Sequence, residues 1–271
     1  MMKRTKALAA PYIVWMTVFI VVPLILVIYF AFTTKNGDFT IDNITSMTRF
    51  MPVLFRSIWL AFISTAICLV IAFPLAFIIS RAMPKKQSTL LMLMLLPMWI
   101  NFLLRTYAWI TLLDSNGIIN HVLSFFGLPT FDNMLNNQSA IVLGMVYNYL
   151  PFMILPLYSV MTKIDSSIVE AAQDLGASQL SVVARVIIPL SLPGISTGII
   201  MVFVPSISTF IISRMLGGGT NDLIGDIIEQ QFLGTSYNPH LGSAMALVLM
   251  IIVLLIMSLF NQFGDNEEYM L

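Results

Sequence analysis

The residue types that carry out bond chemistry are few in this sequence and lie far apart. His121 and His240 have no cysteine or paired carboxylate nearby, so we expect no metal site. The single cysteine, Cys68, lies inside an apolar run, which excludes an internal disulfide and a cysteine-based metal cluster. No combination of serine, histidine and aspartate indicates hydrolysis. We therefore predict no catalytic residue.

Two further patterns could bind charged ligands without catalysis. Asp222, Asp226 and Glu229 stand at i, i+4 and i+7, a spacing that places three carboxylates along one face of a helix. The glycines at 217–219 are not followed by G-x-x-x-x-G-K-[ST], so they do not predict a phosphate-binding loop. The chain itself is expected to bind no nucleotide and no other cofactor.

The elements that position these residues have the composition of a membrane protein. Of 271 residues, 58% are hydrophobic and 10% are charged, and the mean hydropathy is +0.92. A soluble domain carries about 25% charged residues, so a soluble enzyme is disfavoured. The 13 lysines and arginines balance the 13 aspartates and glutamates, so we expect no basic surface that binds nucleic acid.

Six long apolar runs predict six membrane-spanning helices, because a span needs about 20 mostly apolar residues. None of the runs alternates as the strands of an outer-membrane barrel do. We expect an all-α membrane protein whose first run is a retained helix, since it is too long for a signal peptide. The expected spans are Ala7 to Phe32, Ser57 to Ser80, Leu90 to Leu113, Ser139 to Met161, Pro193 to Ser213, and Leu241 to Phe263.

The distribution of lysine and arginine favours both termini on the cytoplasmic side, because these residues are retained there. With this orientation eight of them are cytoplasmic and five lie on the other side. The cytoplasmic set is Lys3, Arg4, Lys6, Arg81, Lys85, Lys86, Lys163 and Arg185, and the other set is Lys35, Arg49, Arg56, Arg105 and Arg214.

The cytoplasmic connection between the fourth and fifth spans predicts two helices separated by a glycine. Ser167 and Glu170 have the spacing of a capping box, in which each side chain satisfies a backbone donor at a helix start. Gly176 supplies the left-handed residue at which that helix ends. Ala171 and Ala172 have small side chains, so another surface could approach closely. We interpret the connection as a docking element.

The docking element comprises residues 162–188, and Pro189 follows it. Five residues keep a fixed spacing here. Glu170-Ala171-Ala172 is followed after three residues by Gly176, and after nine more by Val186-Ile187-Ile188-Pro189. This pattern resembles the EAA signature of ABC importer permeases. The family signature ends in I-x-L-P, so Val186 and Ile188 are conservative departures. The resemblance implies a coupling helix that sits in a groove of the ATPase subunit. The alternative, a helix cap at Glu170, leaves Pro189 unexplained.

A wider resemblance covers approximately residues 57–260. It points to a narrower group of proteins in three stretches, at 149–158, 187–194 and 216–225. These stretches are similar to the first permease subunit of spermidine/putrescine importers. The resemblance implies a type I ABC importer permease (MetI-like) fold in one domain, residues 1–271, without enzymatic activity. It also implies a multi-pass protein of the bacterial inner membrane. The implied partners are a second permease in a heterodimer, two ATP-binding subunits that hold ATP and Mg, an extracytoplasmic polyamine-binding protein, and lipid.

A polyamine is a flexible chain of ammonium groups, so its path should offer carboxylates and aromatic faces. The three carboxylates could form an acidic mouth, a solvated helix face, or contacts to the binding protein. Polar and aromatic residues of the third and fourth spans could line the path, although tryptophan and tyrosine also anchor helices at the membrane interface. The predicted path residues are Trp99, Asn101, Tyr107, Tyr147, Asn148, Asp222, Asp226 and Glu229.

Three other residues have two interpretations each. Gly194 and Gly198 form a G-x-x-x-G step, which permits close contact either with the partner permease or within this chain. Arg105 either opposes cation leakage or marks the outer end of the third span.

Other functions stay open on the sequence alone. The same machine could carry an oxyanion, an amino acid, a sugar or an iron complex. A secondary transporter or channel should show inverted repeats or intramembrane ionisable residues, and neither is clear here. A membrane-bound enzyme should show clustered histidine, cysteine or acidic residues, which the sequence does not supply.

Overall fold

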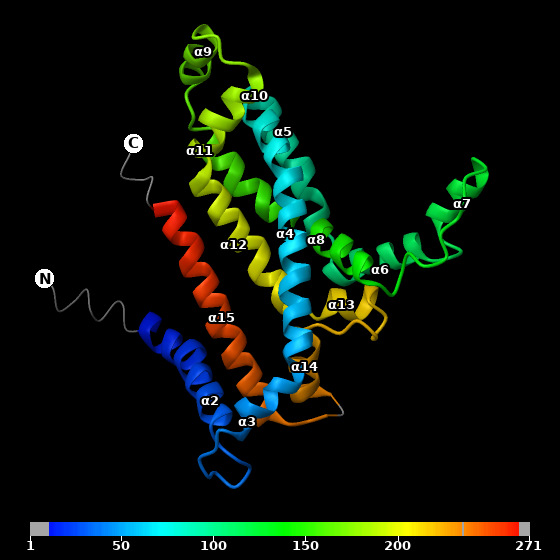
Figure 1. Cartoon of the computed structure of the whole chain (residues 1–271), viewed down its shortest axis with the longest axis vertical. Coiled ribbons are helices and arrows are strands. Elements are labelled where there is room, and N and C mark those ends of the chain that lie inside the picture. Colours follow the sequence, from blue (N-terminus) through cyan, green and yellow to red (C-terminus); the bar gives the residue numbers. More distant parts are fainter. Residues whose placement is uncertain (1–10, 235, 266–271) are drawn as a thin grey trace, which may run out of the picture. The chain divides into compact units, whose positions relative to one another are not determined.

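The computed structural model describes residues 11–234 and 236–265 of the chain. In these ranges the regular structure is helical, apart from one isolated antiparallel bridge between Thr33 and Phe39. Four helices are long and apolar enough to cross a membrane, and two bent helix pairs raise the number to six if each pair is one span. The predicted all-α membrane fold is therefore confirmed (Figure 1).

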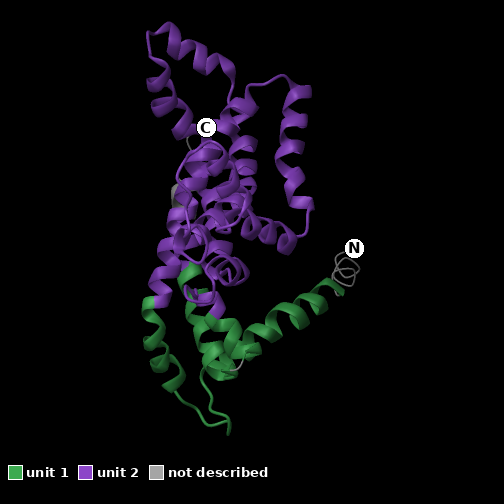
Figure 2. Ribbon diagram, turned by 90° about the vertical axis from the view of Figure 1, so that its right-hand side faces the viewer, with its two compact units in different colours: residues 1–52, 227–254 green, residues 53–226, 255–271 purple. Residues whose placement is uncertain are grey.

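The chain divides into two compact units, which are coloured separately in Figure 2. The smaller unit comprises residues 1–52 and 227–254. Its core joins Ala31, Ala244 and Leu247, and the His240 Nδ1 atom lies 3.2 Å from the Phe30 carbonyl oxygen. The helices of this unit are η1 (Thr17–Val21), α2 (Val22–Ala31), α3 (Asp42–Ser46), η2 (Met47–Phe50), the later part of α14 (Ile224–Leu233) and the first part of α15 (Pro239–Asp265).

The first expected span corresponds to a helical stretch, Pro11–Ala31, and the last to Pro239–Phe260. Residues 7–10 of the first expected span lie outside the described residues. The second expected span is part of a longer continuous helical stretch, Asp42–Ser80.

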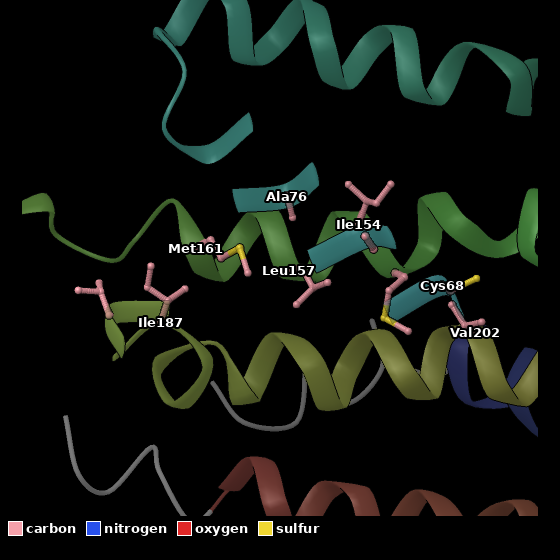
Figure 3. Close-up of a cluster of buried hydrophobic side chains, with 10 residues drawn as sticks. Cys68, Ala76, Ile154, Leu157, Met161, Ile187 and Val202 are labelled. Atoms are coloured by element: carbon pink, nitrogen blue, oxygen red, sulfur yellow. The ribbon is translucent and has the colours of Figure 1, made fainter. Parts of the chain in front are cut away.

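The larger unit, residues 53–226 and 255–271, packs around α4 (Met51–Ser80), α8 (Gln138–Met161) and α12 (Leu192–Ser208). Small side chains on α4 let the helices approach, and flexible or branched side chains fill the space between them. Figure 3 shows this core. Its fully or almost fully buried members include Cys68, Ala72, Ala76, Met153, Ile154, Leu157, Met161, Ile187 and Val202.

The contact of α12 with α8 depends on two glycines. A Cβ atom added at Gly194 would lie 3.0 Å from the Pro156 carbonyl oxygen, and one added at Gly198 would lie 2.6 Å from the Met153 sulfur. Both distances are too short for an ordinary side-chain contact. The G-x-x-x-G step therefore serves packing within this subunit, which is one of its two interpretations.

The third expected span, Leu90 to Leu113, is not one helix. The structure breaks it between Trp99 and Phe102 at a bend of 88°. The helices before the bend are α5 (Pro84–Leu95) and η3 (Leu96–Trp99), and those after it are α6 (Phe102–Leu113) and α7 (Ile118–Phe125).

Local capping explains this break. Pro97 stands in the first turn of η3, and the Asn101 side chain accepts a hydrogen bond from the Leu103 N–H at 2.9 Å as the N-cap of α6. The Arg105 Nη1 atom donates to the Pro97 carbonyl oxygen at 3.2 Å, across the bend. The hydropathy of a run does not depend on the direction of its backbone, so hydropathy alone could not predict the size of this bend.

The fifth expected span, Pro193 to Ser213, was also wrong at its end. α12 ends at Ser208, and a separate short helix, α13 (Ile211–Leu216), follows. The helical segment before α12 meets it at 70°. That segment consists of α10 (Gln179–Val182), η4 (Val183–Ile187) and α11 (Ile188–Leu190).

The substitution Gly194→Leu should loosen the packing of α12 on α8, because the new side chain would meet the Pro156 carbonyl and Val160. We expect a loss of about 1–3 kcal/mol in stability, the usual cost of overpacking. The measurement is the thermal unfolding midpoint in detergent. Thr197→Leu is the matched control, because Thr197 lies on the exposed face of the same helix. An equal effect of both substitutions would contradict the packing role.

Candidate docking element and transport path

The first helix of the docking element is α9 (Ser166–Asp174), and it begins two residues earlier than predicted. The Asp165 side chain is its N-cap and accepts a hydrogen bond from the Ser167 N–H at 3.0 Å. This bond holds the pKa of the Asp165 carboxyl below its ordinary value. The predicted capping box of Ser167 and Glu170 was therefore wrong, because the earlier start moves Glu170 into the second turn.

The end of α9 has the geometry predicted for Gly176. This glycine takes a φ of 82°, a left-handed value that strains other residues. Its N–H donates to the Gln173 carbonyl at 2.8 Å, and the Ala177 N–H donates to the Ala172 carbonyl at 3.1 Å. These two bonds form a Schellman motif, which turns the chain sharply between α9 and α10.

The helices α9 and α10 of the docking element lie at one end of the larger unit (Figure 1, top). Leu175 and Leu180, on either side of Gly176, are 89% and 83% exposed. Exposed leucines close together mark a contact surface. Sequence reasoning missed both leucines, although their place at the turn was a usable signal. Of the predicted docking residues, Glu170, Ala171 and Gly176 are exposed, and Ala172 and Pro189 are half-buried.

The three carboxylates do not share one helix face, because Asp222 precedes α14. The Asp226 side chain is 0% exposed. One of its oxygens, Oδ2, accepts hydrogen bonds from the Ser213 hydroxyl at 2.5 Å and from the Leu223 N–H at 2.8 Å. The other, Oδ1, lies 3.9 Å from the Arg214 Nε atom. Asp226 therefore ties α13 to the start of α14 and does not stand on an exposed face.

Burial raises the pKa of the Asp226 carboxyl, against the lowering effect of its hydrogen bonds. Asp222 is half-buried in the larger unit, and Glu229 is half-buried in the smaller unit. Of the three carboxylates, only Asp222 and Glu229 are thus partly exposed, and the role of each toward a cation stays a prediction.

Two residues of α4 that sequence reasoning placed in no site hold the segment before α14. The Arg56 guanidinium donates to the Asp222 carbonyl oxygen, and the Ser57 hydroxyl accepts the Ile224 N–H at 2.8 Å. The partners are 166 and 167 residues apart in the sequence. No local pattern could have revealed these contacts.

The predicted path residues near the bend of the third span have different surroundings. Trp99 and Tyr107 are exposed, and Asn101 is an exposed helix cap. The half-buried Tyr147 ring lies 5.6 Å from the Arg105 guanidinium carbon and meets the Trp109 ring edge to face at 5.3 Å. Arg105 therefore has a structural role at the bend, where it also contacts Pro97.

Asn148 is the buried member of the predicted path. Its Nδ2 atom donates to the Gly144 carbonyl at 2.8 Å, within the same helix. Its Oδ1 atom has no hydrogen-bond partner in the part of the chain that the structure describes. An unpaired acceptor at membrane depth is costly, so Asn148 remains a candidate path residue.

The structure contains a polar cavity of about 400 Å³ between the end of α6 and the start of α8, and none of the predicted path residues lines it. Within the described ranges, no three residues of the types His, Cys, Asp and Glu gather to form a metal site. The cavity is lined by Asp114, Ser115, Asp132, Asn133, Leu135, Asn136 and Asn137.

Comparison with known proteins identifies relatives along nearly the whole chain. The family described as "Binding-protein-dependent transport system inner membrane component" matches residues 2–265. The spermidine/putrescine transport system permease protein PotB of Haemophilus influenzae is 38% identical over 251 residues, which cover 89% of this chain and 87% of that protein. PotB of Escherichia coli K12 is 36% identical over 248 residues, which cover 88% of this chain and 90% of that protein.

Solved structures show the same fold. A bacterial ABC transporter that imports the acidic polysaccharide alginate has a chain with a TM-score of 0.78 and 19% identity, covering 97% of this chain and 96% of that one. The MetNI methionine ABC transporter has a chain with a TM-score of 0.59 and 18% identity, covering 82% of this chain and 97% of that one. The predicted permease fold and the family resemblance are confirmed, and the chain belongs to the non-catalytic inner membrane components of binding-protein-dependent transport systems.

Proposed function

We propose that this chain is a permease subunit of an ABC importer that moves polyamines, such as spermidine and putrescine, into the cell. The observation that carries the proposal is the identity of 36–38% to PotB proteins of two bacteria over most of the chain. The likeness to the alginate and methionine transporters supports the fold alone. The alternative is an importer of the same architecture that carries another solute. Substrate competition distinguishes polyamine transport from this alternative.

The proposed complex contains a second permease subunit, two ATP-binding subunits that hold ATP and Mg, and an extracytoplasmic polyamine-binding protein. ATP closes the ATPase dimer and moves the docking element. The path between the two permeases then changes its access from outside to inside. Such alternation requires that nucleotide and substrate each favour one of the two states.

The arrangement of the docking element supports this coupling. Leu175 and Leu180 offer an apolar contact for an ATPase groove. The helices from α10 to α11 lead directly into α12, which packs on α8 at Gly194 and Gly198. Because packed interfaces shift between discrete arrangements, a movement of the docking element would reach α8 through α12.

The proposed orientation follows from α8. This span has the docking element at its C-terminal end and the loop that contains Asp114 and Asp132 at its N-terminal end. The two therefore lie on opposite faces of the membrane if α8 crosses it. The excess of lysine and arginine favours a cytoplasmic location for the docking element and both termini.

Polyamine transport predicts loss of uptake when this chain is deleted. We expect that uptake of labelled spermidine falls to background in cells that have no other polyamine importer. In cells with the chain, putrescine should compete and ATP depletion should stop uptake, whereas amino acids and sugars should not compete. Unchanged spermidine uptake would disprove the assignment of polyamines as the substrate, but it would not affect the assignment of the permease fold.

The coupling role predicts a specific defect in Gly176→Lys and in Glu170→Ala. Membrane insertion should be normal, while binding of the ATPase subunit weakens and uptake is lost. A loss of about 1.4 kcal/mol in docking corresponds to a tenfold weaker association. The measurement is co-purification of the ATPase subunit together with spermidine uptake.

Gly219→Lys is the matched control for Gly176→Lys. Gly219 also has a positive φ, 72°, and also has open space around its Cα atom, but it lies outside the docking element. If both lysine variants lost ATPase binding equally, backbone strain would explain the defect. Normal uptake in Gly176→Lys and Glu170→Ala would disprove the coupling role.

An attraction of substrate by Asp222 and Glu229 predicts that Asp222→Asn together with Glu229→Gln raises the KM for spermidine. Surface ion pairs contribute about 0.2–1 kcal/mol each, so an increase of about 2- to 30-fold is expected when both are lost. Initial uptake rates at subsaturating spermidine measure this effect. The control is Asp38→Asn with Asp42→Asn, which removes two charges from exposed positions elsewhere. An unchanged KM in the test variant would show that neither carboxylate attracts substrate.

A further inference from the structure

α7 and the turn after it expose apolar side chains that the proposed transport function does not use. Ile118, Val122 and Phe125 lie on one face of the helix, at i, i+4 and i+7. Phe125 and Phe126 are 85% and 71% exposed. The whole set, the α7 patch, comprises Ile118, Val122, Phe125, Phe126, Leu128 and Phe131.

The α7 patch has a defined shape, because hydrogen bonds fix the end of α7. Gly127 takes a φ of 68°, and its N–H donates to the Ser124 carbonyl at 3.0 Å. The Leu128 N–H donates to the Leu123 carbonyl at 2.9 Å. These bonds form a Schellman motif, which leaves the aromatic end of the helix projecting.

A buried asparagine fixes the other end of the patch. The Asn120 Nδ2 atom donates to the Phe131 carbonyl oxygen at 2.9 Å, and its Oδ1 atom accepts the Phe131 N–H at the same distance. The rings of Phe125 and Phe126 pack edge to face at 5.4 Å. The patch is therefore preformed, and little side-chain entropy is lost when something covers it.

The charge of this segment favours lipid over a soluble partner. Residues 115–131 contain no aspartate, glutamate, lysine or arginine, whereas Asp114 and Asp132 flank the segment on both sides. The rim of a protein interface is polar and contributes charge complementarity, and this segment offers none. Aromatic side chains on an uncharged apolar face are typical of helices that lie in the membrane interface.

The position of the patch also favours lipid. α6 and α7 leave the preceding helices at 88°, so they run across the direction of α5. α8, a span, begins at Gln138, which is 7 residues after Phe131. Seven residues reach at most about 25 Å, so Phe131 lies within that distance of the start of this span. Figure 1 shows α7 apart from α4, α8 and α12 of its own unit.

We propose that the α7 patch inserts into the headgroup and upper acyl region of the membrane, on the face opposite to the docking element. The apolar side chains enter the lipid, and the polar positions of the helix, His121 and Ser124, face water. In this position α7 holds the bend between η3 and α6 at a fixed depth in the membrane. The proposed occupant is the bilayer itself, and contact with the second permease is the competing outcome.

The test uses the assembled importer with Phe125→Cys in a Cys68→Ala background, labelled with bimane and placed in phosphatidylcholine nanodiscs. Doxyl groups on the upper acyl chain should quench the probe about threefold or more, as for a side chain in the interface. Asp38→Cys is the control, since Asp38 is also exposed but lies in a loop with the charged Lys35, outside the α7 patch and the docking element. The control should show no quenching by lipid.

Phe126→Cys is a second labelling site with the same expectation, so that failure of one variant to assemble does not decide the test. Emission at long wavelength with free access to iodide would place the patch in water and overturn the proposal. Blue-shifted emission without doxyl quenching and without iodide access would place it against protein, and that result would also overturn the proposal.

Discussion

The structure depends on one constraint: inside a bilayer, a peptide N–H or C=O group has no water to bind and must find a partner within the protein. Long helices satisfy this requirement by themselves, and they make up the spans. Every bend or break therefore needs a donor or acceptor from elsewhere. In this chain many polar side chains supply these donors and acceptors. A soluble enzyme would use the same residue types for catalysis.

The bend in the third span shows how this works. Asn101 accepts the N–H of Leu103 at the new helix start, and Arg105 donates to the Pro97 carbonyl across the bend. A similar logic operates where α13 leads into α14, because Asp226 accepts the Leu223 N–H and Ser57 accepts the Ile224 N–H. Two of the side chains predicted for a transport path, Asn101 and Asp226, are thus partners of broken helices.

Hydropathy and local turn chemistry were sufficient to predict the helical membrane fold and the left-handed turn at Gly176, because both depend on neighbouring residues. The 88° angle of the bend near Pro97 could not be predicted, since a run of apolar residues has the same composition whether it is straight or folded back. The burial of Asp226 and the hydrogen bond from Arg56 to the Asp222 carbonyl were missed as well, because the partners lie in other segments of the chain. The start of α9 was misplaced because Asp165 and Ser167 are both good caps, and the structure uses Asp165.

The exposed leucines of the docking element also bear on the life of the chain before assembly. A newly inserted copy without its ATP-binding partner carries Leu175 and Leu180 uncovered at the tip of a rigid turn. Uncovered apolar tips of this kind aggregate or are taken up by chaperones and proteases. In the proposed importer the ATP-binding partner covers this surface, so its exposure would distinguish an orphan subunit from an assembled one.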